Sequence, residues 1–257
     1  MAHQDIIEFD QADGNARRHD GATATILETV SIQAVLPNTV RGIAFDRLGN
    51  FHYVMNFFAP AKYVYRHVGF TSTVDSFIAT PSNGPYGVAW MKRSDHANYM
   101  YTTDATTDSA YVHQGFTTTI VASWATGKTL TLGISIDENP IIDYAMIEHD
   151  NGNGGAVRFL WDGTGGPIDT INYAFKFYGL DSAWEDGDED NIRLTSFIFL
   201  GVRYIRRSQG FTTTLISDTT VASATLIGVT FFEDISVRAG TRRQRQVKSL
   251  IRRKPRC

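Results

Sequence analysis

Three aspartates alternate with other residues in one short acidic segment of the chain, at Asp186, Asp188 and Asp190. Carboxylates at alternating positions of a loop can surround a hard cation such as Ca²⁺ with oxygen ligands. The segment lacks the central glycine and the distant glutamate of a complete EF-hand loop. We therefore predict a solvated acidic loop and no cofactor, with Ca²⁺ bound by these three aspartates as the alternative.

Three histidines lie two residues before a glycine, at His19, His67 and His113. Imidazole is the commonest metal-binding side chain, but a metal site requires three ligands that converge on one ion. The histidines are about 47 residues apart, which indicates equivalent places in a repeat and not one cluster. We predict that they lie near hairpin turns at the rim of the protein.

Catalytic motifs are missing from the sequence. It contains no GxSxG nucleophile motif and no phosphate-binding loop, and its single cysteine, Cys257, excludes an intramolecular disulfide and a cysteine-based zinc site. Asp46 and Asp137 occupy matching positions, and a pair of acids could serve a glycosidase. We expect them to cap repeat turns, and we predict that the protein is not an enzyme.

The charged residues are distributed unevenly. Residues 238–257 contain nine basic residues and no acid, which leaves 15 basic against 27 acidic residues in the rest of the chain. We predict a globular domain over residues 1–240 and a basic tail over 241–257. Such a tail is typical of contact with an acidic protein surface or, less favoured here, with nucleic acid. The proposed contacts are Arg242, Arg243, Arg245, Lys248, Arg252, Arg253, Lys254 and Arg256.

The elements that carry these residues repeat with a period of about 47. The segments GFTSTV, GFTTTI and GFTTTL, together with the weaker copies DGATATI and DGTGGPI, each contain a glycine. The fifth residue after that glycine is apolar in all five copies. A second signature, typified by RGIAFD, recurs five times at a similar spacing. The turn glycines are Gly21, Gly69, Gly115, Gly163 and Gly210.

Each repeat contains four short runs rich in Val, Ile, Tyr, Phe and Thr, which favours four strands, and no stretch resembles a transmembrane helix. Four strands per repeat of this length are typical of a β-propeller blade. The sequence therefore predicts an all-β, five-bladed β-propeller. The chain begins within a blade, at a hairpin near residues 15–28, and ends with a blade's inner strands. We expect the N-terminal outer strands to pair with the C-terminal inner strands and close the ring.

One copy resembles an NHL-type propeller repeat, through the residues Gly42, Ile43, Ala44, Asp46, Gly49, Asn50 and Tyr53. That resemblance implies a propeller fold and a binding role. The size of the ring is also similar to that of the five-bladed lectins. The threonine-rich units without a secretory signal resemble phage virion or tail proteins, so we expect a virion or cytoplasmic setting.

Binding by a propeller is expected at the mouth of its central channel, where the loops after the second and fourth strands meet. These loops contain aromatic, amide and charged residues, which suit a peptide or a sugar. We predict a non-enzymatic virion component that docks on other protein subunits, and the alternative is a lectin that binds a glycan. The candidate residues are Asn56, Phe57, Tyr86, Asp104, Lys128, His149, Lys176 and Tyr178.

Overall fold

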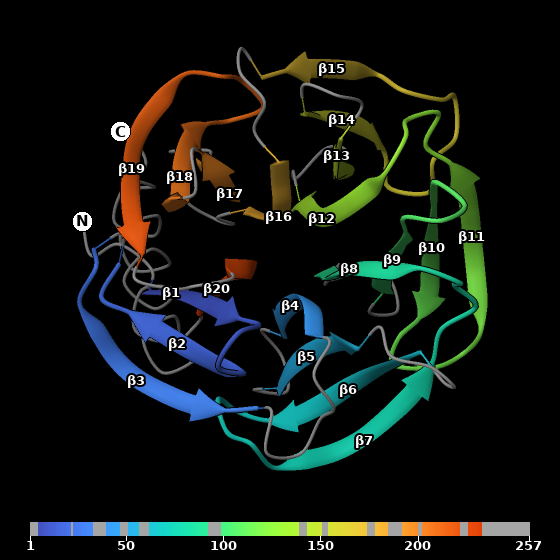
Figure 1. The fold of residues 1–257 in the computed structure, drawn as a ribbon. Coiled ribbons are helices and arrows are strands. Elements are labelled where there is room, and N and C mark those ends of the chain that lie inside the picture. Colours follow the sequence, from blue (N-terminus) through green and yellow to red (C-terminus); the bar gives the residue numbers. More distant parts are fainter. Residues whose placement is uncertain are drawn as a thin grey trace, which may run out of the picture.

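The protein is a ring of five β-sheets around a central channel (Figure 1). The structure is a computed structural model that describes residues 5–21, 23–32, 40–46, 51–56, 62–91, 99–138, 143–150, 154–173, 178–184, 192–199, 202–221 and 226–232. The described residues contain 20 strands and no helix. Each sheet has four antiparallel strands, as the repeat predicts.

The five blades follow the sequence repeat. Blade 1 consists of β20 (Leu226–Phe232), β1 (Asp5–Asp10), β2 (Asn15–His19) and β3 (Ile26–Ser31). Blade 2 consists of β4 (Val40–Asp46), β5 (Phe51–Asn56), β6 (Tyr63–Val68) and β7 (Val74–Ala79). Blade 3 consists of β8 (Pro85–Met91), β9 (Tyr99–Asp104), β10 (Ser109–Gln114) and β11 (Ile120–Ala125). Blade 4 consists of β12 (Thr131–Glu138), β13 (Asp143–His149), β14 (Gly155–Leu160) and β15 (Asp169–Asn172). Blade 5 consists of β16 (Tyr178–Trp184), β17 (Ile192–Phe199), β18 (Val202–Gln209) and β19 (Leu215–Val221).

The ring closes where β20 pairs with β1, so the two ends of the chain share blade 1. Pairing between N-terminal and C-terminal strands is confirmed, but the division of the strands differs from our expectation. The N-terminus contributes three strands and the C-terminus one, because the segment DIIEFD forms the second strand. Ile6, Ile7 and Phe9 of this strand are buried, which explains why it belongs to the sheet.

The turn glycines have the backbone conformation that a tight hairpin requires. Their φ angles lie between 53° and 75°, a region that residues with a Cβ atom rarely adopt. The threonine two residues later closes the turn, as Thr117 shows: its hydroxyl donates to the carbonyl of Gln114 and accepts from the backbone N–H of Thr119. The same pair of bonds recurs at Thr23, Thr71 and Thr212. The structure thus confirms the predicted turns and explains the threonine in four of them; blade 4 has Gly165 at this position.

The second signature places a glycine where the innermost strands crowd around the axis. A β-carbon on Gly87 would lie 2.8 Å from the backbone nitrogen of Ile134 and from the carbonyl oxygen of Leu132. Gly42 and Gly228 approach the next blade in the same way. The inner strand of every blade also has a register shift at this point. A bulge and a glycine therefore let neighbouring backbones touch at the centre.

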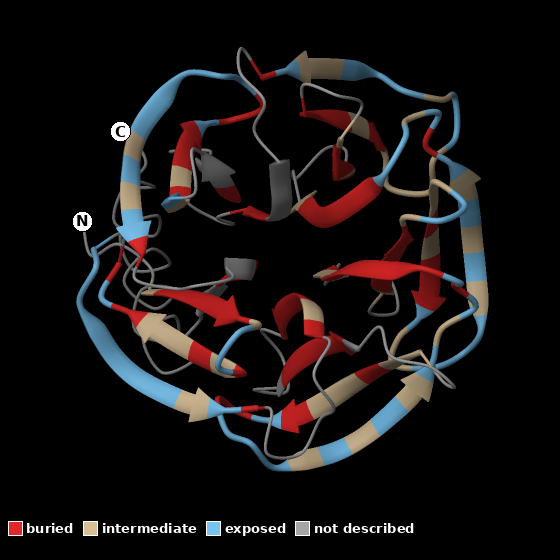
Figure 2. Cartoon of the chain, viewed as in Figure 1, coloured by how far each residue is buried: buried red, intermediate tan, exposed pale blue. Residues whose placement is uncertain are grey.

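The hydrophobic core is divided among the five interfaces between blades. Each interface contains one of the five largest clusters of buried apolar side chains. The phenylalanine after a turn glycine packs on the preceding blade, as Phe116 does on Tyr53, with ring centroids 5.3 Å apart. Blade 4 has Thr164 at this position, and there Trp161 instead stacks on Tyr99 of blade 3. Figure 2 shows the resulting gradient from buried inner strands to exposed outer strands.

Candidate functional site

Two of the predicted mouth residues, Tyr86 and Asp104, hold the loops of the channel mouth in place. The Asp104 carboxylate is fully buried and accepts backbone hydrogen bonds from Asn83 and Gly84 in one loop and from Thr106 and Thr107 in another. Burial alone would raise its pKa, but these hydrogen bonds outweigh burial and lower it. The Tyr86 ring is largely buried beneath the Arg41 guanidinium, 5.2 Å from the ring centroid.

Lys128 and His149 lie in neighbouring mouth loops. His149 is fully buried, whereas Lys128 is half-buried. Burial and the charge of Lys128 lower the pKa of His149 to about 4, although Asp150 opposes this shift. The imidazole is therefore neutral near pH 7, and the charge that this part of the mouth presents comes from Lys128 and Asp150.

The remaining predicted site residues have no described side chain. Asn56 lies at the end of β5 and Tyr178 at the start of β16, while Phe57 and Lys176 lie outside the described residues. The predicted cation loop and the tail also lie outside them, with the residues Asp186, Asp188, Asp190, Arg242, Arg243, Arg245, Lys248, Arg252, Arg253, Lys254 and Arg256. Within the described part of the chain, no three His, Cys, Asp or Glu side chains are grouped so that they could hold a metal ion.

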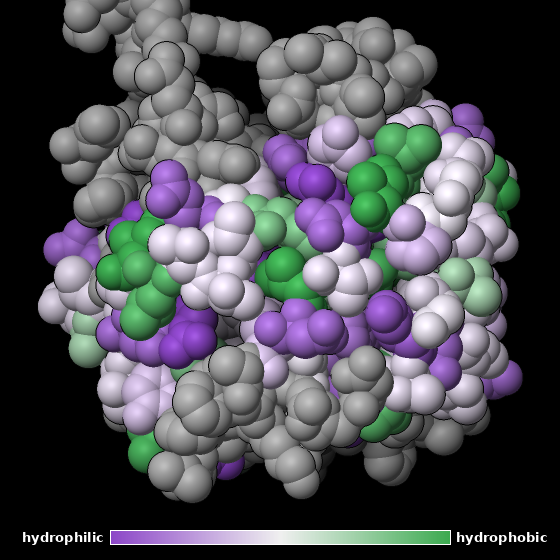
Figure 3. Space-filling view, turned by 90° about the horizontal axis from the view of Figure 1, so that it is seen from above, coloured by the Kyte–Doolittle hydropathy of each residue, from purple (hydrophilic) through white to green (hydrophobic). Residues whose placement is uncertain are grey.

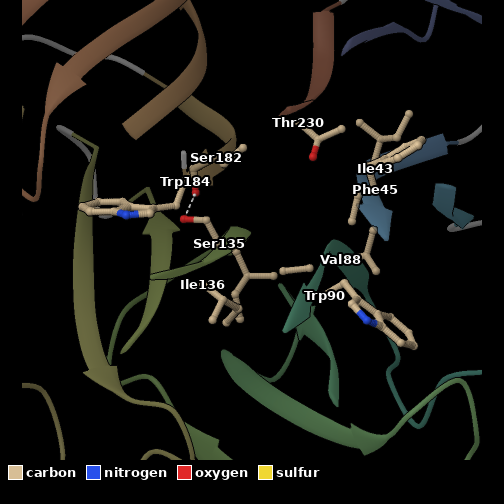
Figure 4. A pocket seen from close by; sticks show the side chains of 13 residues that line it. Ile43, Phe45, Val88, Trp90, Ser135, Ile136, Ser182, Trp184 and Thr230 are labelled. Carbon is tan, nitrogen blue, oxygen red and sulfur yellow. Dashed lines mark hydrogen bonds between the residues drawn. The ribbon is translucent and has the colours of Figure 1, made fainter. Parts of the chain in front are cut away.

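The central channel is narrow, and most residues that line it have apolar side chains, although polar atoms make up most of the surface that faces its cavity (Figure 4). Its cavity of about 50 Å³ is lined by the innermost strands of all five blades. Ser182 donates a hydrogen bond to Ser135 across the interface between blades 5 and 4, at 3.0 Å, and Thr230 adds a third hydroxyl. A space of this size accepts a few water molecules. The described lining includes Ile43, Val88, Ile134, Ile136, Trp90 and Trp184.

Asp137 is an acidic residue whose pKa is raised, and it lies at one of the two matching positions considered for an acid pair. Burial raises its pKa to about 6, the charge of Arg158 opposes the shift, and Asp143 adds to it. A carboxyl group with such a pKa could act as a general acid. Its position at the end of β12 fits the turn-capping place that we predicted, and the side chain of its counterpart Asp46 is not described.

The repeat histidines lie beside hairpin turns, as we predicted, and their side chains are buried. His19, His67 and His113 are all at most 3% exposed. His67 stacks on His52 of the neighbouring strand, with ring centroids 4.5 Å apart and an angle of 13°. They are buried because the hairpin turn that follows each of them folds back over the strand; His113, for example, lies 3.0 Å from the carbonyl oxygen of Thr117.

We expect stability to fall in acid because of the stacked pair. Burial and the neighbouring His67 lower the pKa of His52 to about 3, and burial lowers the pKa of His67 to about 4. The unfolded chain takes up these protons below about pH 6.5, before the folded chain does, so their contribution is complete above that pH and is lost below it. At pH 5 each histidine should reduce the unfolding free energy by about 2 kcal/mol.

Urea unfolding at pH 7, 6 and 5 measures this loss. Imidazole NMR signals provide the control, since neither His52 nor His67 should titrate in the folded protein between pH 5 and 7. Titration of both rings near pH 6.5 would show that the pair is not held neutral by burial.

The outer wall contains apolar residues at a repeated, exposed position. The residue five places after each turn glycine begins the outermost strand or lies just before it, and Ile26, Ile168 and Leu215 are 47%, 48% and 51% exposed there. Val74 and Ile120, the two other copies, are half-buried. We name these five residues the apolar collar. Figure 3 shows apolar side chains separated by hydrophilic ones on one side of this wall.

Sequence reasoning missed an aromatic cluster on the outer hairpin of blade 2. Tyr63 lies edge-on to Phe77, with ring centroids 4.9 Å apart, and Tyr65 lies 5.6 Å from Phe77. The Phe77 side chain is 55% exposed. Alternation along β6 and β7 places the three rings on one face, a signal that inspection of facing strands could have found.

A buried polar cluster between blades 4 and 5 was also missed. The Arg193 guanidinium lies 3.5 Å from the fully buried Glu148 carboxylate, which also accepts a hydrogen bond from the Tyr173 hydroxyl. Burial raises the pKa of Glu148, while Arg193 and Tyr173 oppose that shift. Arg193 and Glu148 are 45 positions apart in the sequence, so no local motif identifies this ion pair. The cluster links two blades and is closed to a ligand.

In the described part of the chain there is no helix of the length and apolar character that a membrane crossing requires.

Comparison with known proteins supports the fold of this chain but identifies no family for it. No protein-family model and no curated protein matches the chain. A protein of unknown function from Bacteroides caccae is similar in structure, with a TM-score of 0.55 and 6% identity over 90% of this chain and 100% of that chain. A chain of a nidogen/laminin complex has a TM-score of 0.54 and 16% identity, with 90% and 85% of the two chains covered. At these identities the likeness is one of fold: the chain is a five-bladed β-propeller.

Proposed function

We propose that this protein is a non-catalytic module that docks on other protein subunits of a larger assembly. The apolar collar is the observation that supports this proposal. The side chain at the collar position is about half-exposed in three of the five blades, yet the residue there is apolar in all five. Exposed apolar surface arranged in a pattern is typical of protein–protein contact.

The central channel also supports a non-catalytic role. Its cavity has room only for a few water molecules and is too small for a substrate. The carboxylate of the described mouth residue Asp104 is bound to the backbone of its own loops. The basic tail supplies a proposed second contact, to an acidic surface of a neighbouring subunit. A virion is the setting that we propose for the assembly, because the threonine-rich repeat units resemble those of phage virion or tail proteins.

Charged substitution in the collar should release the protein from its assembly. We expect Leu215→Lys and Ile168→Lys together to reduce co-sedimentation with the purified assembly by at least about tenfold, equivalent to 1.4 kcal/mol. Both residues are half-exposed, so the melting temperature should hardly change. Thr220→Lys, at an exposed position later on β19, is the matched control.

Retention of the double variant in the assembly would contradict docking through the collar. A glycan is the second candidate ligand, because exposed aromatic rings such as that of Phe77 can stack on sugar rings. The lectin function is favoured if the collar variant still co-sediments with the assembly. Phe77→Ala, and the wild type in excess soluble glycan, should then no longer co-sediment.

A further inference from the structure

The outermost strand of blade 3 presents an edge that is suited to pairing with another strand. β11 is the terminal strand of its sheet, hydrogen-bonded to β10 on one side only. In Figure 1 it lies on the perimeter of the ring, with no described segment outside it. Open edges of this kind are templates for association, and proteins usually protect them with Lys, Pro or other charged residues.

Charge distinguishes β11 from the other four outermost strands of the described sheets. None of the five contains Lys, Arg or Pro, but four contain carboxylates, namely Glu28, Asp75, Asp169 and Asp218. All four lie within 4 Å of an arginine of the adjacent strand. β11 has the sequence IVASWA, without any charge, and the uncharged stretch extends from Gly115 to Gly127.

The backbone groups that face outward can be assigned from the hydrogen-bond pattern. Thr126 donates its N–H to the carbonyl of Asp108, which fixes the alternation along the antiparallel pair. Ala122 and Trp124 therefore bond to β10, while Ser123 and Ala125 direct their N–H and C=O groups to the open edge. Val121, Ser123 and Ala125 also have exposed side chains, and Val121 is 45% exposed.

We propose that β11 pairs with the β11 strand of a second copy of this chain, so that two rings share an eight-stranded antiparallel sheet. A two-fold axis at Ser123 places Val121 beside Ala125 of the other copy, and Ser123 beside its equivalent. No like charges meet in this arrangement, whereas the equivalent self-pairing of β19 places Asp218 beside its own copy at the axis. The contact is separate from the collar function proposed above, because it uses main-chain groups of one blade.

Ser123→Pro tests the proposal, because it removes an N–H that points outward and leaves the bonds to β10 intact. Proline is tolerated on an edge strand whose N–H faces solvent. Sedimentation equilibrium of the full chain should show a concentration-dependent dimer for the wild type and a monomer for Ser123→Pro. Thr220→Pro, at an outward position of β19 that corresponds to Ala125, should dimerise like the wild type.

If Ser123→Pro is unstable, two further measurements still test the proposal. Ser123→Lys should also be monomeric, since it places two like charges at the axis. Amide exchange at Ser123 and Ala125 should slow by at least about tenfold with rising protein concentration in the wild type only. A wild type that stays monomeric up to its solubility limit overturns the proposal, and so does a dimer that survives Ser123→Pro and Ser123→Lys or is lost in Thr220→Pro.

Discussion

Gly87→Ala should destabilise the propeller by about 4 kcal/mol or more, enough to prevent folding of a domain of ordinary stability. The new Cβ atom would lie 2.8 Å from the Ile134 nitrogen and 2.9 Å from the Gly133 Cα atom of blade 4. These are backbone atoms of a buried inner strand, so they cannot rotate away as a flexible side chain could. The blades would have to separate at the axis. Urea unfolding followed by tryptophan fluorescence measures the effect.

Gly127→Ala is the matched control for this substitution. Gly127 has a φ of 66°, and no heavy atom lies within 4 Å of the position that a Cβ atom would take, so an alanine there suffers backbone strain alone. That strain costs about 1–2 kcal/mol. Equal loss of stability in Gly87→Ala and Gly127→Ala would contradict the close approach of blades 3 and 4.

Deletion of residues 1–10 should abolish closure of the ring. It removes β1, the strand that lies between β20 and β2, and with it the buried side chains of Ile6, Ile7 and Phe9. Burial of three such side chains contributes about 5–9 kcal/mol, comparable to the whole stability of a domain. The deletion also exposes two strand edges, so the variant should aggregate. Light scattering and circular dichroism of the purified variant test this result.

Deletion of residues 1–4 provides the control, since it leaves β1 intact and should have little effect on stability. A synthetic peptide of residues 1–12 should restore solubility to the longer deletion by occupying the gap between β20 and β2. If the protein without residues 1–10 melts like the full chain, the closure seen in blade 1 does not hold the ring together.

The architecture of the ring was predictable because it rests on local patterns. The hairpin between the two outer strands has a glycine with positive φ in all five blades, and a threonine closes the turn in four of them, so Gly69, Gly115 and Gly210 mark the period directly. Strand four follows each turn at a constant distance. Five copies of two signatures then leave little choice of fold.

The roles of individual polar side chains were less predictable. Asp104 was expected to face a ligand at the mouth, and it is instead surrounded by backbone donors from two loops. The histidines were expected near hairpin turns, but the burial of His67 and its stacking on His52 were not predicted. Burial depends on what the neighbouring strand and the following turn place over a side chain, which its own sequence neighbours do not reveal.

The sequence by itself determined the number of blades, the four strands of each blade and the meeting of the chain ends, since these follow from residues close together in the chain. Only the tertiary structure decided which N-terminal segment completes blade 1 and why glycine recurs at the axis. It also decided that Arg193 lies beside Glu148 and that β11 has an open edge without charge. These features arise from contacts between residues far apart in the sequence, where the strands of one blade meet those of the next.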